Sequence, residues 1–229
     1  MTSAAPARPV TDVEVFLDVS CPWCHGGLAT IRRLLDEVAA DPSLPGVRLR
    51  WRFIRLHDMN PPEGMPASAQ WAKYGMDEEQ AAAAKLEVGR FLRSVGVGMD
   101  WNRHTYLYNP LLAHRLLAMV RDEGGDDLPD LWSVARAVWS ANFMKGVAID
   151  DPYALRAAVL EAGIDVPERI WTRLADPQDH LAETLADRER ALEVSLDGVP
   201  RFYLNGTIVP AWKPIDEVRA NLRAALAGG

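Results

Sequence analysis

The sequence predicts an α/β fold in which a large helical segment interrupts a small sheet. Two short strand patterns lie near the start of the chain, helical periodicity then continues to about Leu196, and a hairpin signal follows it. A chain of 229 residues is long enough to bury a substantial core. We therefore expect a sheet domain in two halves, with the helical segment inserted between them.

The first strand pattern leads directly into a helix pattern. A mostly apolar run is typical of a strand buried inside a sheet. The apolar residues of this strand are Val13, Val15, Phe16, Leu17 and Val19. The apolar residues of the helix, at helical spacing, are Leu28, Ile31, Leu35 and Val38. The pattern predicts a strand, a tight turn and a helix in succession.

The second strand pattern alternates strictly. Apolar side chains occupy every second position from Val47 to Phe53, and arginines occupy the positions between them. A row of charges discourages further pairing, so we expect this strand at an edge of the sheet. We expect Arg48, Arg50 and Arg52 to form a solvated face rather than one that steers substrate.

Helix-start signals recur through the middle of the chain. The Pro- and Gly-rich segment 57–68 predicts a boundary, and Asp77 is expected to cap a helix that stops near Gly96. A capping residue followed by proline predicts three further starts, at Asn109, Asp151 and Asp176. The apolar face of the last helix is expected to carry Leu181, Leu185, Leu192 and Leu196.

Strand periodicity returns near the C-terminus. Apolar runs flank Asn205-Gly206, and both residues of this pair tolerate positive φ, which strongly predicts a two-residue hairpin turn. A helix is expected to begin at Pro214. A strand–helix–strand unit, an insertion, an antiparallel hairpin and a closing helix together have the topology of a thioredoxin fold.

Both cysteines of the chain lie in the turn between the first strand and its helix. Cys21 and Cys24 are spaced Cys-x-x-Cys, which places one sulfur at a helix N-terminus and the other one turn inside. Unpaired N–H groups and the positive end of the helix dipole favour a thiolate at Cys21. A thiolate there can attack a disulfide, and Cys24 can resolve the mixed species. The spacing predicts a redox-active dithiol.

Three alternative roles for the cysteine pair fit the sequence less well. A zinc site needs a second pair of ligands, and the remaining histidines lack ligand spacing. Cys21 to His25 matches the Cys-x-x-Cys-His pattern of covalent haem, but we find no export signal. Two inert buried cysteines, with Pro22 fixing the turn, are the third alternative. We expect no metal and no organic cofactor, and allow a low-molecular-weight thiol as co-substrate.

Composition narrows the range of partners. A net charge of −7 argues against nucleic acid or an anionic membrane as the main partner. Two cysteines are too few for a disulfide-stapled secreted scaffold. We see no apolar run of membrane-spanning length and no signal-peptide core at the start. These features predict a cytoplasmic protein.

Two short motifs in this topology resemble a known family. Cys21-Pro22-Trp23-Cys24 together with Gly198-Val199-Pro200 is similar to the DsbA-like branch of the thioredoxin superfamily, and within it to the FrnE-type subgroup. Asn109-x-x-x-Ala113-His114-Arg115-Leu116 resembles the signature of that subgroup's helical insert. The same fold serves the kappa-class glutathione transferases and the 2-hydroxychromene-2-carboxylate isomerases, which typically carry serine at the first cysteine position.

The resemblance implies a substrate site around the cysteines. Pro200 is expected to be cis and to lie against them, so that the Val199 backbone can pair with an extended substrate. Pro22, Trp23, Val199 and Pro200 are the expected substrate-binding residues. The segment 210–214 departs from the turn that this family usually has after the hairpin, so the wall of the groove is expected to differ.

We also assign expected roles to several polar residues near these motifs. Asp18 is a candidate proton relay to Cys24, with a plain strand-end residue as the equal alternative. We expect His25 at the surface. Asn109, His114 and Arg115 are expected to be structural, as a cap and as a polar face under the site, with a substrate contact from Arg115 as the alternative.

The complete prediction is a thiol-disulfide oxidoreductase in which Cys21 attacks and Cys24 resolves. Residues 12–60 and 198–229 are expected to form the thioredoxin-fold domain, 61–197 the helical insertion, and 1–11 a flexible leader. Its partners would be protein thiols or disulfides, or small thiol-linked substrates, with a recycling reductant or oxidant. The chain would be a monomer or homodimer. Two alternatives stay open: an isomerase or transferase that depends on a small thiol, and a chaperone-like peptide-binding module.

Overall fold

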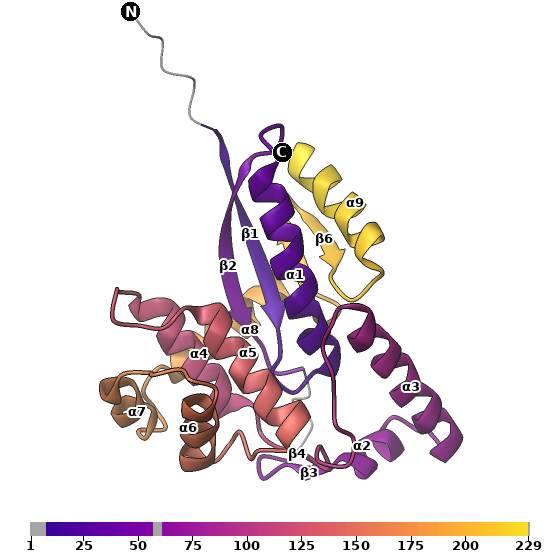
Figure 1. Ribbon diagram of the computed structural model, residues 1–229, viewed down its shortest axis with the longest axis vertical. Coiled ribbons are helices and arrows are strands. Elements are labelled where there is room, and N and C mark those ends of the chain that lie inside the picture. Colours follow the sequence, from indigo (N-terminus) through magenta and orange to yellow (C-terminus); the bar gives the residue numbers. More distant parts are fainter. Residues whose placement is uncertain (1–7, 57–60, 229) are drawn as a thin grey trace, which may run out of the picture.

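A four-stranded sheet forms the centre of the protein in the computed structural model, which describes residues 8–56 and 61–228 (Figure 1). The strand order is β2-β1-β5-β6. Strands β1 and β2 are parallel, whereas β5 is antiparallel to both β1 and β6. The strands are β1 (Val10–Leu17), β2 (Gly46–Phe53), β5 (Arg201–Leu204) and β6 (Thr207–Pro210). The predicted edge position of β2 is confirmed.

Strand β1 is one of the two interior strands of the sheet. Val15 pairs with Trp51 on one side and with Phe202 on the other, and it is fully buried. The apolar run of β1 therefore reflects burial on both faces. The strand already begins at Val10, so residues 10 and 11, predicted as leader, belong to the sheet. The rest of the predicted leader up to residue 7 lies outside the described residues.

Two helices of the sheet domain lie side by side over one face of the sheet (Figure 1). They are α1 (Pro22–Ala40) and α9 (Ile215–Ala227). Pro22 occupies the first helical position of α1, where its missing N–H costs no hydrogen bond. The hairpin between β5 and β6 turns at Asn205 (φ 48°) and Gly206 (φ 76°), as the sequence predicted.

The insertion supplies all the remaining helices of the described residues. They are α2 (Ala67–Lys73), α3 (Glu78–Ser94), α4 (Leu111–Glu123), α5 (Leu131–Ser140), the π turn η1 (Ala141–Lys145), α6 (Pro152–Glu161), α7 (Glu168–Leu174) and α8 (Leu181–Glu193). The insertion also contains a short antiparallel ladder of β3 (Met65–Pro66) and β4 (Tyr106–Leu107). Within residues 8–56 and 61–228, no helix is both long and apolar enough to cross a membrane.

Three helix starts test the capping predictions. Asp77 accepts from the backbone of Gln80 in a capping box, and Asp151 accepts from two backbone N–H groups of α6, so both predictions are confirmed. The predicted start at Asp176-Pro177 is wrong, because α8 begins only after His180, which has a left-handed backbone. Arg115 donates to the carbonyl oxygens of Leu174, Asp176 and Asp179, and this holds residues 176–180 in a turn.

Helix α8 also buries a different face from the one its leucines predicted. Leu185 and Leu192 are 48% and 64% exposed, whereas Thr184, Asp187 and Ala191 are buried. The reason is electrostatic: the side chain of Asp187 is only 1% exposed and is surrounded by hydrogen-bond donors. Leu185 and Leu192, which the spacing placed on the buried face, therefore lie on the exposed side of α8.

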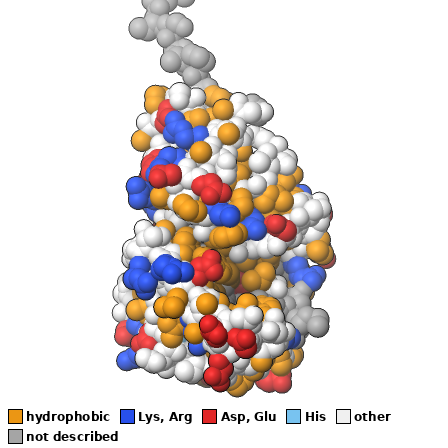
Figure 2. All heavy atoms as spheres, turned by 90° about the vertical axis from the view of Figure 1, so that its right-hand side faces the viewer, with side chains coloured by type: hydrophobic (Ala, Val, Ile, Leu, Met, Phe, Trp, Pro, Cys, Tyr) orange, Lys and Arg blue, Asp and Glu red, His pale blue; other side chains and the backbone are white. Residues whose placement is uncertain are grey.

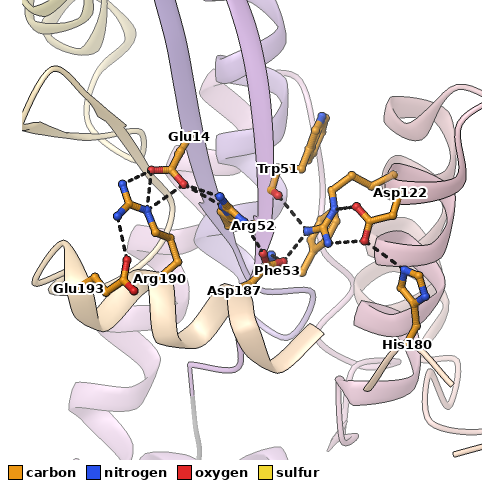
Figure 3. A network of polar contacts seen from close by, with 10 residues as sticks. Glu14, Trp51, Arg52, Phe53, Asp122, His180, Asp187, Arg190 and Glu193 are labelled. Atoms are coloured by element: carbon orange, nitrogen blue, oxygen red, sulfur yellow. Dashed lines mark hydrogen bonds and ion pairs between the residues drawn. The ribbon is translucent and has the colours of Figure 1, made fainter. Parts of the chain in front are cut away.

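A network of ion pairs around Asp187 joins the insertion to the sheet (Figure 3). Asp187 accepts from the backbone N–H of Phe53 and from Arg52, both at 3.0 Å, and from Arg121 of α4. Arg52 also pairs with Glu14 on β1 at 2.8 Å. The network thus links α8, α4, β2 and β1, and Arg52 is not the solvated side chain that its pattern predicted.

The network continues at both ends. Arg190 of α8 also binds Glu14, and Arg121 binds Asp122, which in turn contacts His180 (Figure 3). The other two arginines of β2 behave as predicted. Arg48 and Arg50 are at least half exposed, and each approaches Asp12 at 3.5–3.6 Å.

Replacing Asp187 with asparagine should destabilise the protein strongly. The D187N change removes the negative charge between two partly buried arginines, and breaking a buried pair costs about 3 kcal/mol. The matched control is D12N, which removes an exposed partner and should change the free energy of unfolding by less than about 1 kcal/mol. Urea unfolding monitored by circular dichroism measures both. Equal effects of the two substitutions would contradict the proposed joining role of Asp187.

Candidate active site

The site begins where β1 ends, at a buried carboxylate. Asp18 is fully buried, and its carboxylate accepts the backbone N–H groups of Ser20 at 2.8 Å and Leu56 at 2.7 Å. Its Oδ1 also lies 3.2 Å from Nε2 of His114 on α4. Three separate segments of the chain therefore meet at Asp18: the cysteine turn, the end of β2 and the insertion.

The two cysteines lie at the start of α1. Cys21 precedes the first helical residue, and its carbonyl oxygen accepts from the backbone N–H groups of Cys24 and His25. Both cysteines are free thiols and buried, and they are hydrogen-bonded to each other. The backbone N–H of Asp18 donates to Sγ of Cys24 at 3.4 Å. The geometry brings both thiols together, as the Cys-x-x-Cys spacing predicted.

The Val199–Pro200 segment lies across the helix start. The peptide bond between Val199 and Pro200 is cis, and Sγ of Cys21 lies 3.9 Å from the Val199 carbonyl oxygen. Gly27 of α1 allows this close approach, because a Cβ at that position would come within 2.6 Å of Pro200 Cγ. The predicted substrate-binding residues Val199 and Pro200 are therefore adjacent to the predicted nucleophile.

The two cysteines differ in environment. Burial raises the pKa of the Cys24 thiol well above its ordinary value, and the neighbouring Cys21 and Asp18 raise it further, against the hydrogen bond from the Asp18 backbone. Cys21 lines a pocket, whereas Cys24 is completely buried behind it. Cys21 is therefore the thiol that a substrate can reach.

Asp18 retains its charge at this depth. Burial raises the pKa of Asp18, but the hydrogen bond and electrostatic attraction of His114 and the two backbone N–H donors outweigh burial, so the net pKa lies below its ordinary value. The carboxylate points to these donors, while it is the Asp18 backbone that contacts Cys24. The relay role predicted for Asp18 stays a prediction.

His25 is a correction to the sequence analysis. It is 5% exposed rather than at the surface, and its Nε2 lies 3.1 Å from the carbonyl oxygen of Gly98. A carbonyl accepts only, so Nε2 carries the proton. Burial lowers the pKa of His25 to about 4, against the hydrogen bond to Gly98. His25 is a neutral link between α1 and the segment that follows α3.

Other polar residues prove to hold the turn in place. The Val19 backbone nitrogen lies 3.1 Å from His114 Nε2, and Asn142 Nδ2 donates to the Val19 carbonyl at 2.9 Å. Among the described residues, the hydrogen bonds of Arg115 go to three backbone carbonyls of the insertion. Sequence reasoning missed the pairing of His114 with Asp18 and the role of Asn142, since no local pattern connects residues so far apart.

A pocket of about 410 Å³ opens beside Cys21. Its walls come from the start of α1, from α2 and α3 and from the segment 99–107, and they include Trp23, Trp71 and Trp101. Figure 2 looks onto the side of the molecule that carries α3 and α9, and hydrophobic side chains gather around a hollow midway down that face. Two of the insertion's tryptophans, Trp71 and Trp101, therefore line the site.

The segment 210–214 brings a further aromatic ring to the site. Trp212 packs edge-on against Trp23 with ring centroids 5.7 Å apart, and Phe91 of α3 lies 5.1 Å from Trp23 on centroids. Lys213 lies over the Trp212 ring at 4.4 Å. This segment thus places an aromatic side chain next to the cysteine turn.

The described residues contain no cluster of three or more His, Cys, Asp or Glu side chains that could hold a metal ion. The reactive groups that the structure places at the site are the two thiols, which have buried polar neighbours and a pocket beside them. A dithiol at a helix N-terminus beside a reachable pocket can form and break a disulfide with a substrate.

Comparisons with known proteins agree with this thiol chemistry. A family model described as the DSBA-like thioredoxin domain matches residues 12–223. The structure is similar to that of a probable DsbA oxidoreductase from Streptomyces coelicolor, with 26% identity, 96% of this chain and 91% of that chain covered, and a TM-score of 0.78. None of the curated proteins matches this chain significantly.

Two more distant structures share the fold. The cytosolic disulfide reductase DsbM from Pseudomonas aeruginosa has 16% identity and a TM-score of 0.64, with 95% of this chain and 100% of that chain covered. A 2-hydroxychromene-2-carboxylate isomerase has 14% identity and a TM-score of 0.60, with 95% of each chain covered.

Replacing Asp18 with asparagine should make the Cys24 thiol more acidic. The D18N change removes a negative charge that adds to the effect of burial in raising the pKa of Cys24, while the single amide oxygen can still accept one of the two N–H groups, of Ser20 or of Leu56, that the two carboxylate oxygens accept. The thiolate absorbance at 240 nm, titrated in a Cys21→Ser background, should move to lower pH by roughly one unit. The control is D12N, which is remote from the site. An unchanged or higher midpoint in D18N would contradict the assignment.

Proposed function

The chain belongs to the DsbA-like thioredoxin domain family, and from this premise we propose that it is a thiol-disulfide oxidoreductase with Cys21 and Cys24 as its redox pair. The observation that carries the proposal is the position of Cys21. Its sulfur lies at the start of α1, 3.9 Å from the Val199 carbonyl oxygen and at the wall of an open pocket. The second thiol lies directly behind it.

The first step of the proposed reaction joins the substrate to Cys21. The thiolate of Cys21 attacks one sulfur of a substrate disulfide, forming a mixed disulfide and releasing the other substrate sulfur as a thiolate, which takes a proton from solvent. The backbone of Val199, beside the sulfur, offers a carbonyl to an extended substrate, and Pro22 and Trp23 form part of the surrounding wall.

The second step releases the substrate. Cys24 loses its proton and attacks Sγ of Cys21, which forms the Cys21–Cys24 disulfide and expels the second substrate sulfur. The substrate disulfide gains two electrons, and the cysteine pair loses them. Because burial and Asp18 disfavour the Cys24 thiolate, its deprotonation is the step where Asp18 acts as a candidate proton relay. In reverse, the same steps oxidise a substrate dithiol.

The proposal includes a cellular setting. We place the reaction in the cytoplasm, in keeping with the low cysteine content and with the shared fold of the cytosolic disulfide reductase DsbM. Proteins or small thiol-linked molecules would be the substrates. A reductant or oxidant would recycle the cysteine pair, and the enzyme would be a monomer or a homodimer. The reaction needs no metal or organic cofactor, although a low-molecular-weight thiol can serve as co-substrate.

Replacing Cys24 with serine should trap the reaction at the mixed disulfide. The C24S protein keeps the nucleophile but lacks the thiol that resolves the intermediate. With 2-hydroxyethyl disulfide as substrate and dithiothreitol as recycling reductant, turnover should fall. In a separate incubation with 2-hydroxyethyl disulfide and no reductant, intact-mass spectrometry should show one 2-mercaptoethanol unit bound to Cys21 through a disulfide. The C21S protein, which keeps the buried thiol, is the matched control and should bind none.

The opposite outcome would favour a different reaction on the same fold. An isomerase or transferase that depends on a small thiol needs no resolving cysteine, so C24S would turn over as fast as the wild type and accumulate no adduct. A chaperone-like peptide-binding module would suppress aggregation of an unfolded protein equally well with both cysteines replaced by serine. Either result would overturn the dithiol mechanism.

A further inference from the structure

The pocket beside Cys21 has the size of a small-molecule site. Its volume of about 410 Å³ lies in the range in which proteins bind single small ligands. Cys21 forms part of its wall, so a ligand inside it can present a sulfur atom to the nucleophile. The pocket therefore bears on which of the proposed substrates the enzyme takes.

The walls of the pocket favour a flat ligand. Trp23, Trp71 and Trp101 line it, together with Tyr74 and the aliphatic side chain of Val88. Aromatic rings stack with other rings at separations of about 4.5–7 Å, and this contact adds to the burial of apolar area. A ligand with an aromatic ring would stack on these side chains and bury more apolar area against them than a flexible polar chain would.

One buried polar atom in the pocket lacks a partner. Gln70 is 7% exposed and lines the pocket, and its Oε1 has no hydrogen-bond partner within residues 8–56 and 61–228. A buried acceptor left unpaired is costly, and such an atom in a pocket is satisfied when a ligand supplies an N–H or O–H group. A ligand with a hydrogen-bond donor would therefore pair with Oε1 of Gln70 in this pocket.

The pocket also has a single sign of fixed charge. Lys85 of α3 is the only Lys, Arg, Asp or Glu among the described lining residues, and its Nζ lies 5.7 Å from the Trp101 ring centroid. Lys85 forms no ion pair in the part of the chain that the structure describes. A half-buried ammonium group on an aromatic wall is suited to an anionic group of the ligand.

We propose that this pocket selects small aryl thiols and their disulfides that carry one carboxylate and one N–H or O–H donor. The ring lies among the tryptophans, the donor meets Gln70, the carboxylate meets Lys85, and the sulfur faces Cys21. This assignment rests on the proposed oxidoreductase function. Cys21 attacks the aryl disulfide and expels one aryl thiolate, and Cys24 then expels the second, so the disulfide is reduced to two thiols as the cysteine pair is oxidised.

Binding is tested first without any redox step. The protein is C21S, and the probes are 3-amino-5-(methylthio)benzoate, its benzamide analogue without the charge, and 3-(methylthio)benzoate without the amine. Isothermal titration calorimetry gives the Kd of each. In C21S the carboxylate should tighten binding by about tenfold over the amide, and the amine should tighten it by about fivefold.

Two further variants assign these gains to residues. K85M in the C21S background should reduce the carboxylate gain to about twofold or less, and Q70L should abolish the amine gain while keeping the carboxylate gain. K145M, which removes an exposed lysine paired with Glu161 outside the pocket, is the matched control and should keep both gains. No binding of any probe, or gains that survive K85M and Q70L, would overturn the proposal.

Turnover separates this proposal from the proposed function. With dithiothreitol as recycling reductant, the wild type should reduce the disulfide of 3-amino-5-mercaptobenzoate with a lower KM than K85M shows. If the wild type reduces 2-hydroxyethyl disulfide but K85M leaves the KM for the aryl disulfide unchanged, the pocket assignment fails and the function stands. If the C21S probes bind as expected but no disulfide is reduced, the function fails and the pocket stands.

Discussion

The arrangement of the site depends on one buried charge, the carboxylate of Asp18. A carboxylate without access to water is stable only when donors surround it, and Asp18 obtains them from the cysteine turn, from the segment just after β2 and from α4. These contacts fix where β1 ends and where α1 begins. They also leave the Asp18 backbone N–H directed at Cys24. Asp18 therefore contacts the buried thiol through its backbone N–H, and its charge adds to the effect of burial in raising the pKa of that thiol.

The sheet domain and the insertion contribute different properties. The thiols and the Val199–Pro200 segment belong to the sheet domain, whereas α2, α3 and the segment 99–107 of the insertion form the pocket walls. The network around Asp187 and the link from His25 to Gly98 hold the two parts together. Thiol chemistry and substrate choice can thus vary separately. Under the proposed function, the insertion could change which molecule reaches Cys21 without altering the cysteine pair.

Local signals predicted the parts of this structure that depend on neighbouring residues. The Asn205-Gly206 turn, the helix caps at Asp77 and Asp151 and the cysteine turn all follow from short-range backbone chemistry. The errors concern buried polar side chains with distant partners. His25 is buried, and its hydrogen-bond partner is a carbonyl 73 residues away in the sequence. Asp187 faces the sheet because it binds an arginine of β2 that is 135 residues away. Periodicity counts apolar residues, so it cannot identify a helix face buried through a charge.

The most direct test of this account is a redox titration of the Cys21–Cys24 pair against defined thiol buffers. The oxidised fraction is followed by tryptophan fluorescence, for which Trp23 is the nearest reporter, and by the mass added on alkylation. The account predicts a reversible two-electron transition between about −270 and −120 mV, the range from thioredoxin to DsbA. If no intramolecular disulfide forms, or if Cys21 alone reacts and stays capped by the buffer thiol, the two cysteines are not a redox pair and the account is wrong.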